Sequence, residues 1–367
     1  MATQKFSNVT GKVSDETRFR GRGTASNAVG RYEKLTRHEF DDGWDGLEDL
    51  PPFQTQVREE ISKSIISTNR SPDVPFDLSI NPYRGCEHGC VYCFARPTHT
   101  YWGLSAGLDF ETKLTARVNA VELLEKALAK PSHKVSPIAL GINTDAYQPI
   151  ERRYKLTREI LKVLAITKHP VTIVTKSALI LRDLDILTPM AKEGLVSVAF
   201  SVTSLEGKLA RAMEPRASAP HRRLYALKAL AEAGVPTMTL VAPVIPSLND
   251  HEIETILEAV CECGVKQAGY VLLRLPLEIG DLFRDWLERE VPDRSKRVMS
   301  ILQSMRGGRD YDSRYGKRMR GEGDYADLLS DRFRLAVKRL GMNQTRFKLR
   351  RDLFEAPVPE GGQMKLL

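Results

Sequence analysis

Three cysteines within eight residues are the strongest chemical signal in this sequence of 367 residues. Cys86, Cys90 and Cys93 have the spacing C-x3-C-x2-C, in the segment RGCEHGCVYC. Three thiolates can bind three irons of a cubane cluster and leave the fourth iron open to another molecule. The same thiols, with His88 or His99 as a fourth ligand, would also suit a structural zinc ion. The spacing favours an iron–sulfur cluster, and both kinds of metal site stay open on this motif alone.

The elements that must position this motif form successive βα units. From residue 76 onward, short β-branched runs alternate with amphipathic segments, a pattern typical of a parallel sheet. The expected strands are Asp77–Asn81, Pro137–Asn143, Val171–Thr175, Leu195–Ser201, Pro236–Val244 and Gln267–Arg274. Apolar residues at helical spacing predict helices at 118–128, 156–164, 221–233, 252–260, 282–289 and 332–340, with Asn249 and Glu252 as a capping box. Six such units predict an α/β fold, an incomplete (β/α)6 barrel with the cysteine loop at the C-terminal end of its first strand.

Composition divides the chain into three regions. Residues 1–75 are rich in Gly, Ser, Asp and Arg and predict an N-terminal arm, partly ordered at best. Residues 76–305 hold the partial barrel, and residues 306–367 form a basic, helical C-terminal extension. Between Arg289 and Arg351, 18 Lys and Arg stand against 8 Asp and Glu, whereas the whole chain carries +8. This basic segment indicates either a polyanion partner, such as a nucleic acid, or a folded face in which the arginines pair with nearby acids.

With these residues in place, the sequence resembles the radical S-adenosylmethionine (SAM) superfamily. Within it, the resemblance is to the branch that contains spore photoproduct lyase and related uncharacterised bacterial proteins, and it covers about residues 75–305. It implies a 4Fe–4S cluster on Cys86, Cys90 and Cys93 and SAM at the open iron, whose reductive cleavage yields a radical that abstracts hydrogen from a substrate. It also implies a reducing partner such as flavodoxin or ferredoxin.

The resemblance assigns SAM contacts to residues that follow the cysteine motif and the strand ends. Tyr92, the aromatic residue before the third cysteine, takes the adenine contact by position, and Lys176, after VTIVT, faces the SAM carboxylate. The other assigned residues are Thr144 and Asp145 after the second strand, Ser201 at the end of the fourth, and Arg216 in the tripeptide EPR. For Thr144 and Ser201, capping a following helix is an equally good expectation.

The substrate and the reaction subclass, lyase or transferase, stay open. Spore photoproduct lyase uses a cysteine near the end of its second strand as a hydrogen donor, and this chain has no cysteine between Cys93 and Cys261. We therefore do not expect the photoproduct reaction itself. Cys261 and Cys263 are two apart on a helix, point in different directions and are expected to pack. The alternatives are radical modification or repair of a nucleic acid, and a non-catalytic metal-binding module.

The sequence also bears on the compartment. No apolar run approaches the length that a membrane helix needs, and the first residues lack the pattern of a signal peptide. Clustered thiols in an odd total of five cysteines suit a reducing environment better than a disulfide scaffold. We expect a cytoplasmic protein without a membrane partner.

Overall fold

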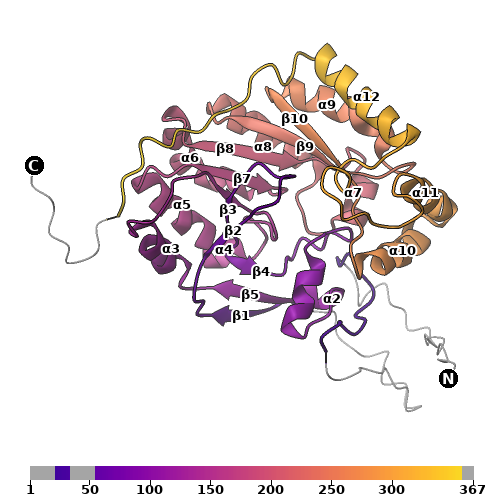
Figure 1. The fold of residues 1–367 in the computed structure, drawn as a ribbon, viewed down its shortest axis with the longest axis horizontal. Coiled ribbons are helices and arrows are strands. Elements are labelled where there is room, and N and C mark those ends of the chain that lie inside the picture. Colours follow the sequence, from indigo (N-terminus) through magenta and orange to yellow (C-terminus); the bar gives the residue numbers. More distant parts are fainter. Residues whose placement is uncertain (1–20, 34–53, 358–367) are drawn as a thin grey trace, which may run out of the picture.

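A seven-stranded sheet forms the centre of the protein in the computed structural model, which describes residues 21–33 and 54–357 (Figure 1). The strand order is β10-β9-β8-β7-β6-β3-β2. Six strands are parallel and follow chain order, whereas β2 pairs antiparallel with β3 at one edge. Their bounds are β2 Ile66–Thr68, β3 Leu78–Ile80, β6 Ile138–Leu140, β7 Val171–Thr175, β8 Val196–Ser201, β9 Thr237–Val244 and β10 Gln267–Leu272.

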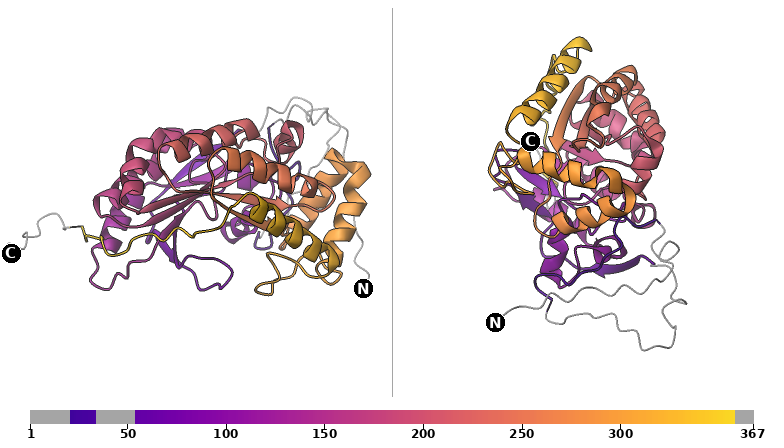
Figure 2. Two further views of the ribbon diagram at one scale, coloured as in Figure 1. Left: turned by 90° about the horizontal axis from the view of Figure 1, so that it is seen from above. Right: turned by 90° about the vertical axis from the view of Figure 1, so that its right-hand side faces the viewer.

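Burial on both faces explains why these apolar runs become parallel strands. Every residue of β6 is buried, as are five of the six residues of β8. Each of the six expected strands is present, shortened by at most three residues at an end. The helices that connect them lie along the sheet and form a layer on one side (Figure 2, left). These are α3 Ala120–Leu128, α5 Leu156–Ile166, α6 Leu184–Lys192, α8 Pro220–Glu232 and α9 Ile253–Glu262.

Short helical segments connect the remaining strand ends. They are η1 Arg96–Trp102, α2 Leu108–Thr112, α4 Glu151–Tyr154, η2 Ala178–Asp183, α7 Gly207–Met213 and η3 Asp250–Glu252. All of them except α2 and η1 follow parallel strands of the main sheet. Those four segments therefore lie among the loops that surround the C-terminal ends of the strands.

A second sheet of three strands lies below the main one (Figures 1 and 2). Its order is β1-β5-β4, with β1 at Gln56–Glu60, β5 at Lys113–Arg117 and β4 at Tyr83–Arg84. One face is apolar, and there Val57, Leu114 and Ala116 pack with Tyr83. Strands β1 and β2 lie within residues 1–75, the region that was expected to be a partly ordered arm. Residues 54–75 are instead part of the fold. Residues 1–20 and 34–53 lie outside the described residues.

The C-terminal extension is more structured than the sequence predicted. Helices α10 (Ile279–Glu290) and α11 (Pro292–Ser304) precede it, and α12 spans Asp324–Arg339, where only 332–340 was expected. Helix α12 packs on α9. Arg332 of α12 donates two hydrogen bonds, of 2.8 and 2.6 Å, to Glu254 of α9. The segment between α11 and α12 folds against β10, because Leu272 N–H donates to Met319 O at 2.9 Å.

The expected capping box at the start of α9 is wrong. The Asn249 side chain accepts from Ile245 N–H at 2.7 Å and donates to the Thr203 and Pro243 carbonyls. Glu252 instead accepts from Ser204 Oγ at 2.7 Å and from the Leu205 N–H at 2.6 Å. Glu252 therefore fixes the loop after β8, and Asn249 ties that loop to the end of β9, so neither side chain caps the helix that follows.

Within the described residues, no helix is both long and apolar enough to cross a membrane. Cys261 and Cys263 lie at the end of α9 and in its cap, half-buried and packed against the main core. Packing is therefore the role that the structure supports for these two thiols.

A histidine pair, buried His169 and half-buried His133, closes the end of the sheet where β7 begins. His169 Nδ1 donates to the Pro170 carbonyl at 3.0 Å, so its Nε2 accepts from His133 Nε2 at 3.0 Å. Phe354 packs against both rings, at centroid distances of 5.4 and 5.3 Å. Burial lowers the pKa of His169 to about 4.

This pair predicts an acid-sensitive contribution to stability. Unfolded His169 titrates near 6.5, so between pH 6.5 and 4 the unfolded state binds the extra proton. The free energy of unfolding should be highest above pH 6.5 and fall by up to about 3 kcal/mol as the pH approaches 4. In denaturant titrations, His169→Asn should flatten this dependence, whereas His221→Gln on the exposed side of α8 should keep it. Equal slopes for His169→Asn and the wild type would contradict the assignment.

Candidate active site

The loop after β3 and β4 brings the three cysteines together. Cys86 and Cys90 are buried, Cys93 is half-buried, and the thiols lie close enough to affect one another electrostatically. Tight turns close the loop: Gly89 N–H donates to Cys86 O at 3.3 Å and Cys93 N–H to Cys90 O at 3.2 Å. Gly89 has a φ of +68°, which glycine adopts without strain.

Arg96 holds this loop from the inside. Its side chain is completely buried, and its charge is balanced by Glu111, whose Oε1 lies 2.5 Å from Arg96 Nη2. The guanidinium also donates to four carbonyls of the surrounding loops. These belong to Cys90 (2.9 Å), Gly89 (3.1 Å), Ala106 (3.1 Å) and Gly107 (2.9 Å). One guanidinium therefore fixes the path of the cysteine loop on several sides.

Glu111 attaches a second segment to the same loop. Its Oε2 accepts from Gly23 N–H at 2.9 Å, and its Oε1 accepts from Thr24 N–H at 3.1 Å. The backbones approach so closely that a Cβ on Gly23 would lie 1.8 Å from the Gly89 carbonyl oxygen. The segment around Gly23 and Thr24 is thus packed directly on the cysteine loop.

The environment of the thiols fits a buried iron–sulfur cluster. Burial raises the pKa of all three thiols, so as free groups they are desolvated and protonated. Backbone N–H groups of Ala95 and Arg96 face Cys93, and that of Asp145 faces Cys86, which opposes the shift. Metal binding would deprotonate these thiols, and the amides facing them would stabilise the resulting thiolates.

The two histidines considered as zinc ligands have other partners. His99 Nε2 lies 2.9 Å from the Lys113 carbonyl oxygen, and buried His88 has its Nδ1 at 3.4 Å from Asp145 Oδ2. Among residues 21–33 and 54–357, no three His, Cys, Asp or Glu side chains are grouped so as to hold a single metal ion. A cubane does not need such convergence, because each thiolate binds a different iron.

Tyr92 and Lys176 meet at a buried carboxylate that sequence analysis missed. Glu214 accepts from the Tyr92 hydroxyl and lies 3.6 Å from Lys176 Nζ, which is 5.7 Å from the Tyr92 ring centroid. Thr203 Oγ1 donates to Glu214 at 2.6 Å, and Arg223 forms a buried ion pair with it. Burial raises the pKa of Glu214 and lowers that of Lys176. Glu214 is the first residue of the EPR tripeptide from which Arg216 was assigned. Its place in that tripeptide was the one sequence signal that could have pointed to it.

Asp145 fixes the end of β7 next to this group. Its Oδ1 accepts from Thr175 Oγ1 at 2.8 Å, and its Oδ2 accepts from the Lys176 N–H at 2.8 Å. Its backbone amide faces Cys86, as described above. The structure therefore brings Asp145, Lys176 and the cysteine loop together.

The remaining predicted site residues have different surroundings. Thr144 Oγ1 donates to the Tyr83 carbonyl at 3.1 Å, and Ser201 is buried at the end of β8 with its carbonyl bound by Arg223. Neither caps a helix, because α4 and α7 begin well beyond them. Arg216 binds the outer part of the cysteine loop: it pairs with Glu87 at 2.5 Å, its N–H donates to the His88 carbonyl at 3.3 Å, and its side chain donates to the Gly21 carbonyl.

Comparison with known proteins agrees with this geometry. The sequence profile of the radical SAM superfamily matches residues 80–260. An uncharacterised Mycobacterium tuberculosis protein is 36% identical over 232 residues, covering 63% of this chain and 68% of its own length. An uncharacterised Methanocaldococcus jannaschii protein is 30% identical over 214 residues, which cover 58% of this chain and 76% of that protein. The chain belongs to the radical SAM superfamily.

Membership makes the protein a radical SAM enzyme, and the family implies SAM and an iron–sulfur cluster as cofactors. The fold resembles that of spore photoproduct lyase. One variant with bound AdoMet and dinucleoside spore photoproduct gives a TM-score of 0.56 at 16% identity, with 78% of this chain and 80% of the other covered. A second variant of spore photoproduct lyase gives a TM-score of 0.55 at 18% identity, with the same coverage of both chains. At such identity the likeness extends to the fold alone.

The Arg96–Glu111 pair gives a stability prediction. Replacing Glu111 with Gln leaves the Arg96 charge buried without a counter-charge, which should lower the free energy of unfolding by about 3–5 kcal/mol. The matched control is Glu122→Gln, which breaks the exposed Glu122–Lys126 pair on α3 and should cost about 0.5 kcal/mol or less. Denaturant titration measures both. Similar midpoints for the two variants would show that the buried pair does not hold the fold.

Proposed function

We propose that this radical SAM enzyme carries a 4Fe–4S cluster on Cys86, Cys90 and Cys93 and abstracts hydrogen from a substrate after reductive cleavage of SAM. The observation that carries the proposal is the group of three thiols on one internally fixed loop, with Lys176 and Tyr92 beside it. When bound, the cluster would supply one electron and an open iron for the amino and carboxylate groups of SAM. An incomplete barrel, a flavodoxin or ferredoxin reductant and a cytoplasmic setting belong to the same proposal.

The chain's own residues would bind and orient SAM. Tyr92 offers its ring to the adenine, and its hydroxyl is fixed by Glu214 and lies 3.2 Å from Thr203 Oγ1. Lys176 would donate to the SAM carboxylate. Its side chain is 16% exposed, so the ammonium is largely withdrawn from water and its bond to a carboxylate is strengthened. Asp145 would act by holding the backbone that carries Lys176.

Glu214 sets the charge balance of this pocket. Arg223 is its buried partner on one side and Lys176 lies on the other, with Asp145 as a second carboxylate near Lys176. Lys176 Nζ is 3.6 Å from Glu214, so the ammonium keeps donors free for a ligand carboxylate. The arrangement therefore supports an anionic group of SAM near Lys176 better than a neutral one.

The arginines of the basic extension support a structural role more than a polyanion partner. Arg314 pairs with Asp312 and Glu322, and it lowers the pKa of Asp312 to about 2. Arg318 pairs with Asp73 at 2.5 Å, and buried Arg306 donates to the Leu273 carbonyl at 2.6 Å. Arg318 and Arg306 thus attach the extension to the main fold, and Arg314 pairs within the extension. A folded face of paired arginines is the alternative to nucleic-acid binding raised from sequence.

The cysteine ligands are tested by single substitutions. Cys86→Ala, Cys90→Ala and Cys93→Ala should each lower bound iron after anaerobic reconstitution and abolish formation of 5′-deoxyadenosine, because a cubane with a missing thiolate is not held. Cys261→Ala and Cys263→Ala are the matched controls and should leave both quantities unchanged. Full SAM cleavage by Cys90→Ala, or colourless zinc-containing wild-type protein, would overturn the proposal.

The role of Lys176 is tested by SAM affinity. Lys176→Ala removes a charge-assisted bond and should weaken SAM binding about 10- to 150-fold while leaving the iron content unchanged. Lys192→Ala, an exposed lysine at the end of α6, serves as the control. Equilibrium binding to the reconstituted protein measures both. Unchanged affinity in Lys176→Ala would remove this residue from the SAM site.

A further inference from the structure

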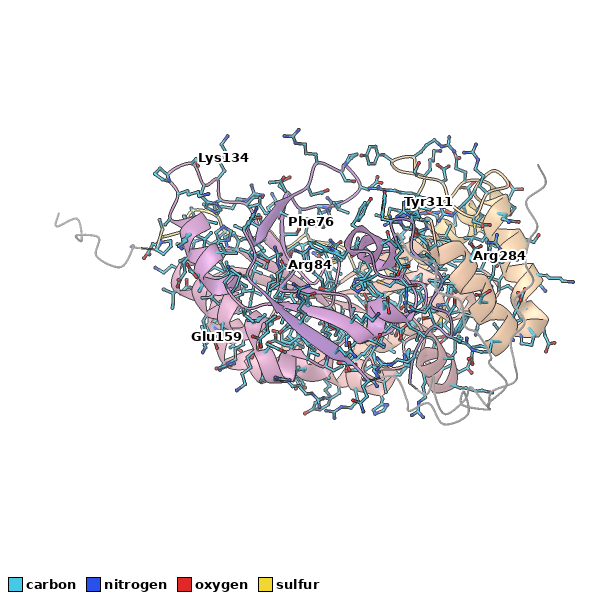
Figure 3. The ribbon with its side chains drawn as sticks, turned by 90° about the horizontal axis from the view of Figure 1, so that it is seen from below. Phe76, Arg84, Lys134, Glu159, Arg284 and Tyr311 are labelled. Atoms are coloured by element: carbon cyan, nitrogen blue, oxygen red, sulfur yellow. The ribbon has the colours of Figure 1, made fainter. Side chains whose placement is uncertain are left out.

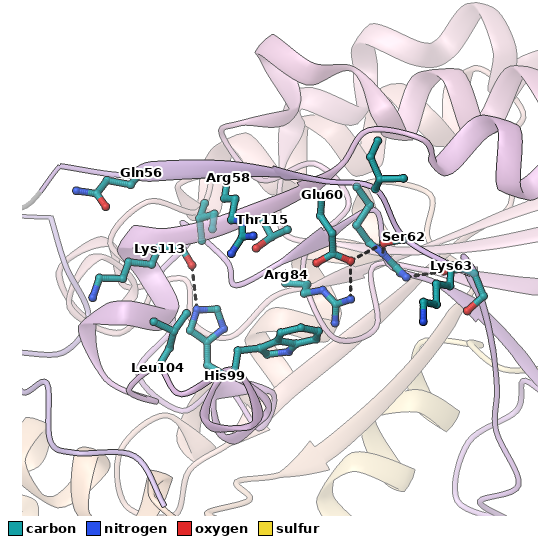
Figure 4. A pocket seen from close by; sticks show the side chains of 15 residues that line it. Gln56, Arg58, Glu60, Ser62, Lys63, Arg84, His99, Leu104, Lys113 and Thr115 are labelled. Carbon is teal, nitrogen blue, oxygen red and sulfur yellow. Dashed lines mark hydrogen bonds and ion pairs between the residues drawn. The ribbon is translucent and has the colours of Figure 1, made fainter. Parts of the chain in front are cut away.

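The three-stranded sheet presents a polar face that the radical SAM site does not use. Gln56, Arg58 and Glu60 of β1 stand on this face, directly opposite Lys113, Thr115 and Arg117 of β5. The alternate residues Val57, Leu114 and Ala116 face the apolar cluster described above. Strand alternation therefore directs charged side chains into the space between this sheet and η1 (Figure 4).

This space is a cavity of about 700 Å³. The sheet forms one wall, and the opposite wall consists of His99, Trp102 and Leu104, in and just after η1. None of its lining residues belongs to the proposed SAM site. A Cβ on Gly85 would meet both Leu114 and His99, so the cavity lies behind the residue that precedes Cys86. Its volume lies in the range of small-molecule binding sites.

The cavity has an excess of positive charge. Five cations line it, Arg58, Lys63, Arg84, Lys113 and Arg117, against the single carboxylate of Glu60. Glu60 pairs with Arg84 at 2.8 Å, and Lys113 pairs with Asp109 at 2.9 Å. Arg117 donates to Ser62 Oγ at 2.8 Å and to nearby carbonyls. Within the described residues, Arg58 and Lys63 have no ion-pair partner. Such a surplus of unpaired cations favours an anionic ligand.

An exposed aromatic platform stands beside these cations. The Arg84 guanidinium lies 4.0 Å from the Trp102 ring centroid, and Trp102 is 55% exposed. Arg84 Nε is buried without a hydrogen-bond partner among the described residues. An indole supported by a guanidinium is a surface on which a planar base stacks. Phosphate-binding cations and a stacking indole in one cavity match the two halves of a nucleotide.

We propose that this cavity binds a nucleotide, with its base on Trp102 and its phosphate near Arg58 and Lys63. The source of the nucleotide is either a free mononucleotide or one unit of a single strand. The proposal does not depend on the function proposed above, because the two sites share no residue.

The test compares binding of four probes to the full-length protein: AMP, adenosine, inorganic phosphate and a short fluorescent oligothymidylate. AMP should bind more tightly than adenosine or phosphate alone, and excess SAM, which has no phosphate, should not displace it. Arg58→Gln and Lys63→Gln should each weaken AMP binding about tenfold. Trp102→Ala should weaken it about 5- to 100-fold, because the stacking surface is lost, and Trp102→Phe should restore part of the affinity.

Matched controls come from elsewhere on the surface. Lys134→Gln removes an exposed lysine far from Arg84 (Figure 3), and Tyr225→Ala removes the exposed ring of the Arg222–Tyr225 contact on α8. Both should bind AMP like the wild type. Thermal unfolding checks that the cavity variants are folded, and SAM cleavage without substrate should be unchanged in them.

The outcomes separate the two sources. Oligothymidylate binding tighter than AMP, with a salt slope of several times the −0.7 expected per single-strand phosphate, identifies a strand. Comparable affinities identify a free nucleotide. The proposal is overturned if phosphate binds as tightly as AMP, if nothing binds at low ionic strength, or if the cavity variants bind like the wild type. Absence of SAM cleavage in the wild type would instead refute the proposed function and leave this binding result standing.

Discussion

The buried pair between Arg96 and Glu111 is the interaction on which the rest of this structure depends. A guanidinium with no solvent exposure is stable only with its charge balanced and its donors paired, and here one carboxylate and four loop carbonyls do both. Two of those carbonyls belong to the cysteine loop, and the same carboxylate binds the amides of Gly23 and Thr24. The loop that carries the thiols is therefore held by protein contacts alone, as a site that must keep three ligands in a fixed arrangement requires.

A second buried carboxylate organises the other side of the site. Glu214 receives Tyr92, Thr203 and Arg223, and it lies near Lys176. These residues come from the cysteine loop, the end of β8, α8 and the end of β7, so one carboxylate joins four separate parts of the fold. Parallel strands in sequential order make this possible, because their C-terminal ends meet along the same edge of the sheet. The polar residues at those ends can then be fixed by a few buried charges.

Sequence patterns predicted those parts of the molecule whose structure depends on residues close together in the sequence. The six parallel strands followed from apolar runs, and the thiol group followed from the spacing of Cys86, Cys90 and Cys93. The three-stranded sheet was missed because β1 and β5 are mostly polar and become a sheet only through an apolar face shared with Tyr83. The capping box failed for a related reason: Glu252 binds the loop after β8 and Asn249 ties that loop to the end of β9, contacts that no local pattern reveals. Arg96 with Glu111, and Tyr92 with Glu214, are likewise pairs that only the folded chain defines.

The distribution of charge shows the same limit of local reasoning. By composition, the strongest excess of basic residues lies between Arg289 and Arg351, and a polyanion partner would be sought there. In the folded chain, Arg314, Arg318 and Arg332 of that segment have carboxylate partners, so much of its charge is neutralised within the protein. Arg58 and Lys63 come from a stretch without notable charge excess, yet they stand in a cavity where a single carboxylate faces five cations. Binding an anion depends on unpaired charge rather than on total charge. We therefore infer that the anion-binding surface lies at the small sheet behind the cysteine loop and not at the C-terminal extension.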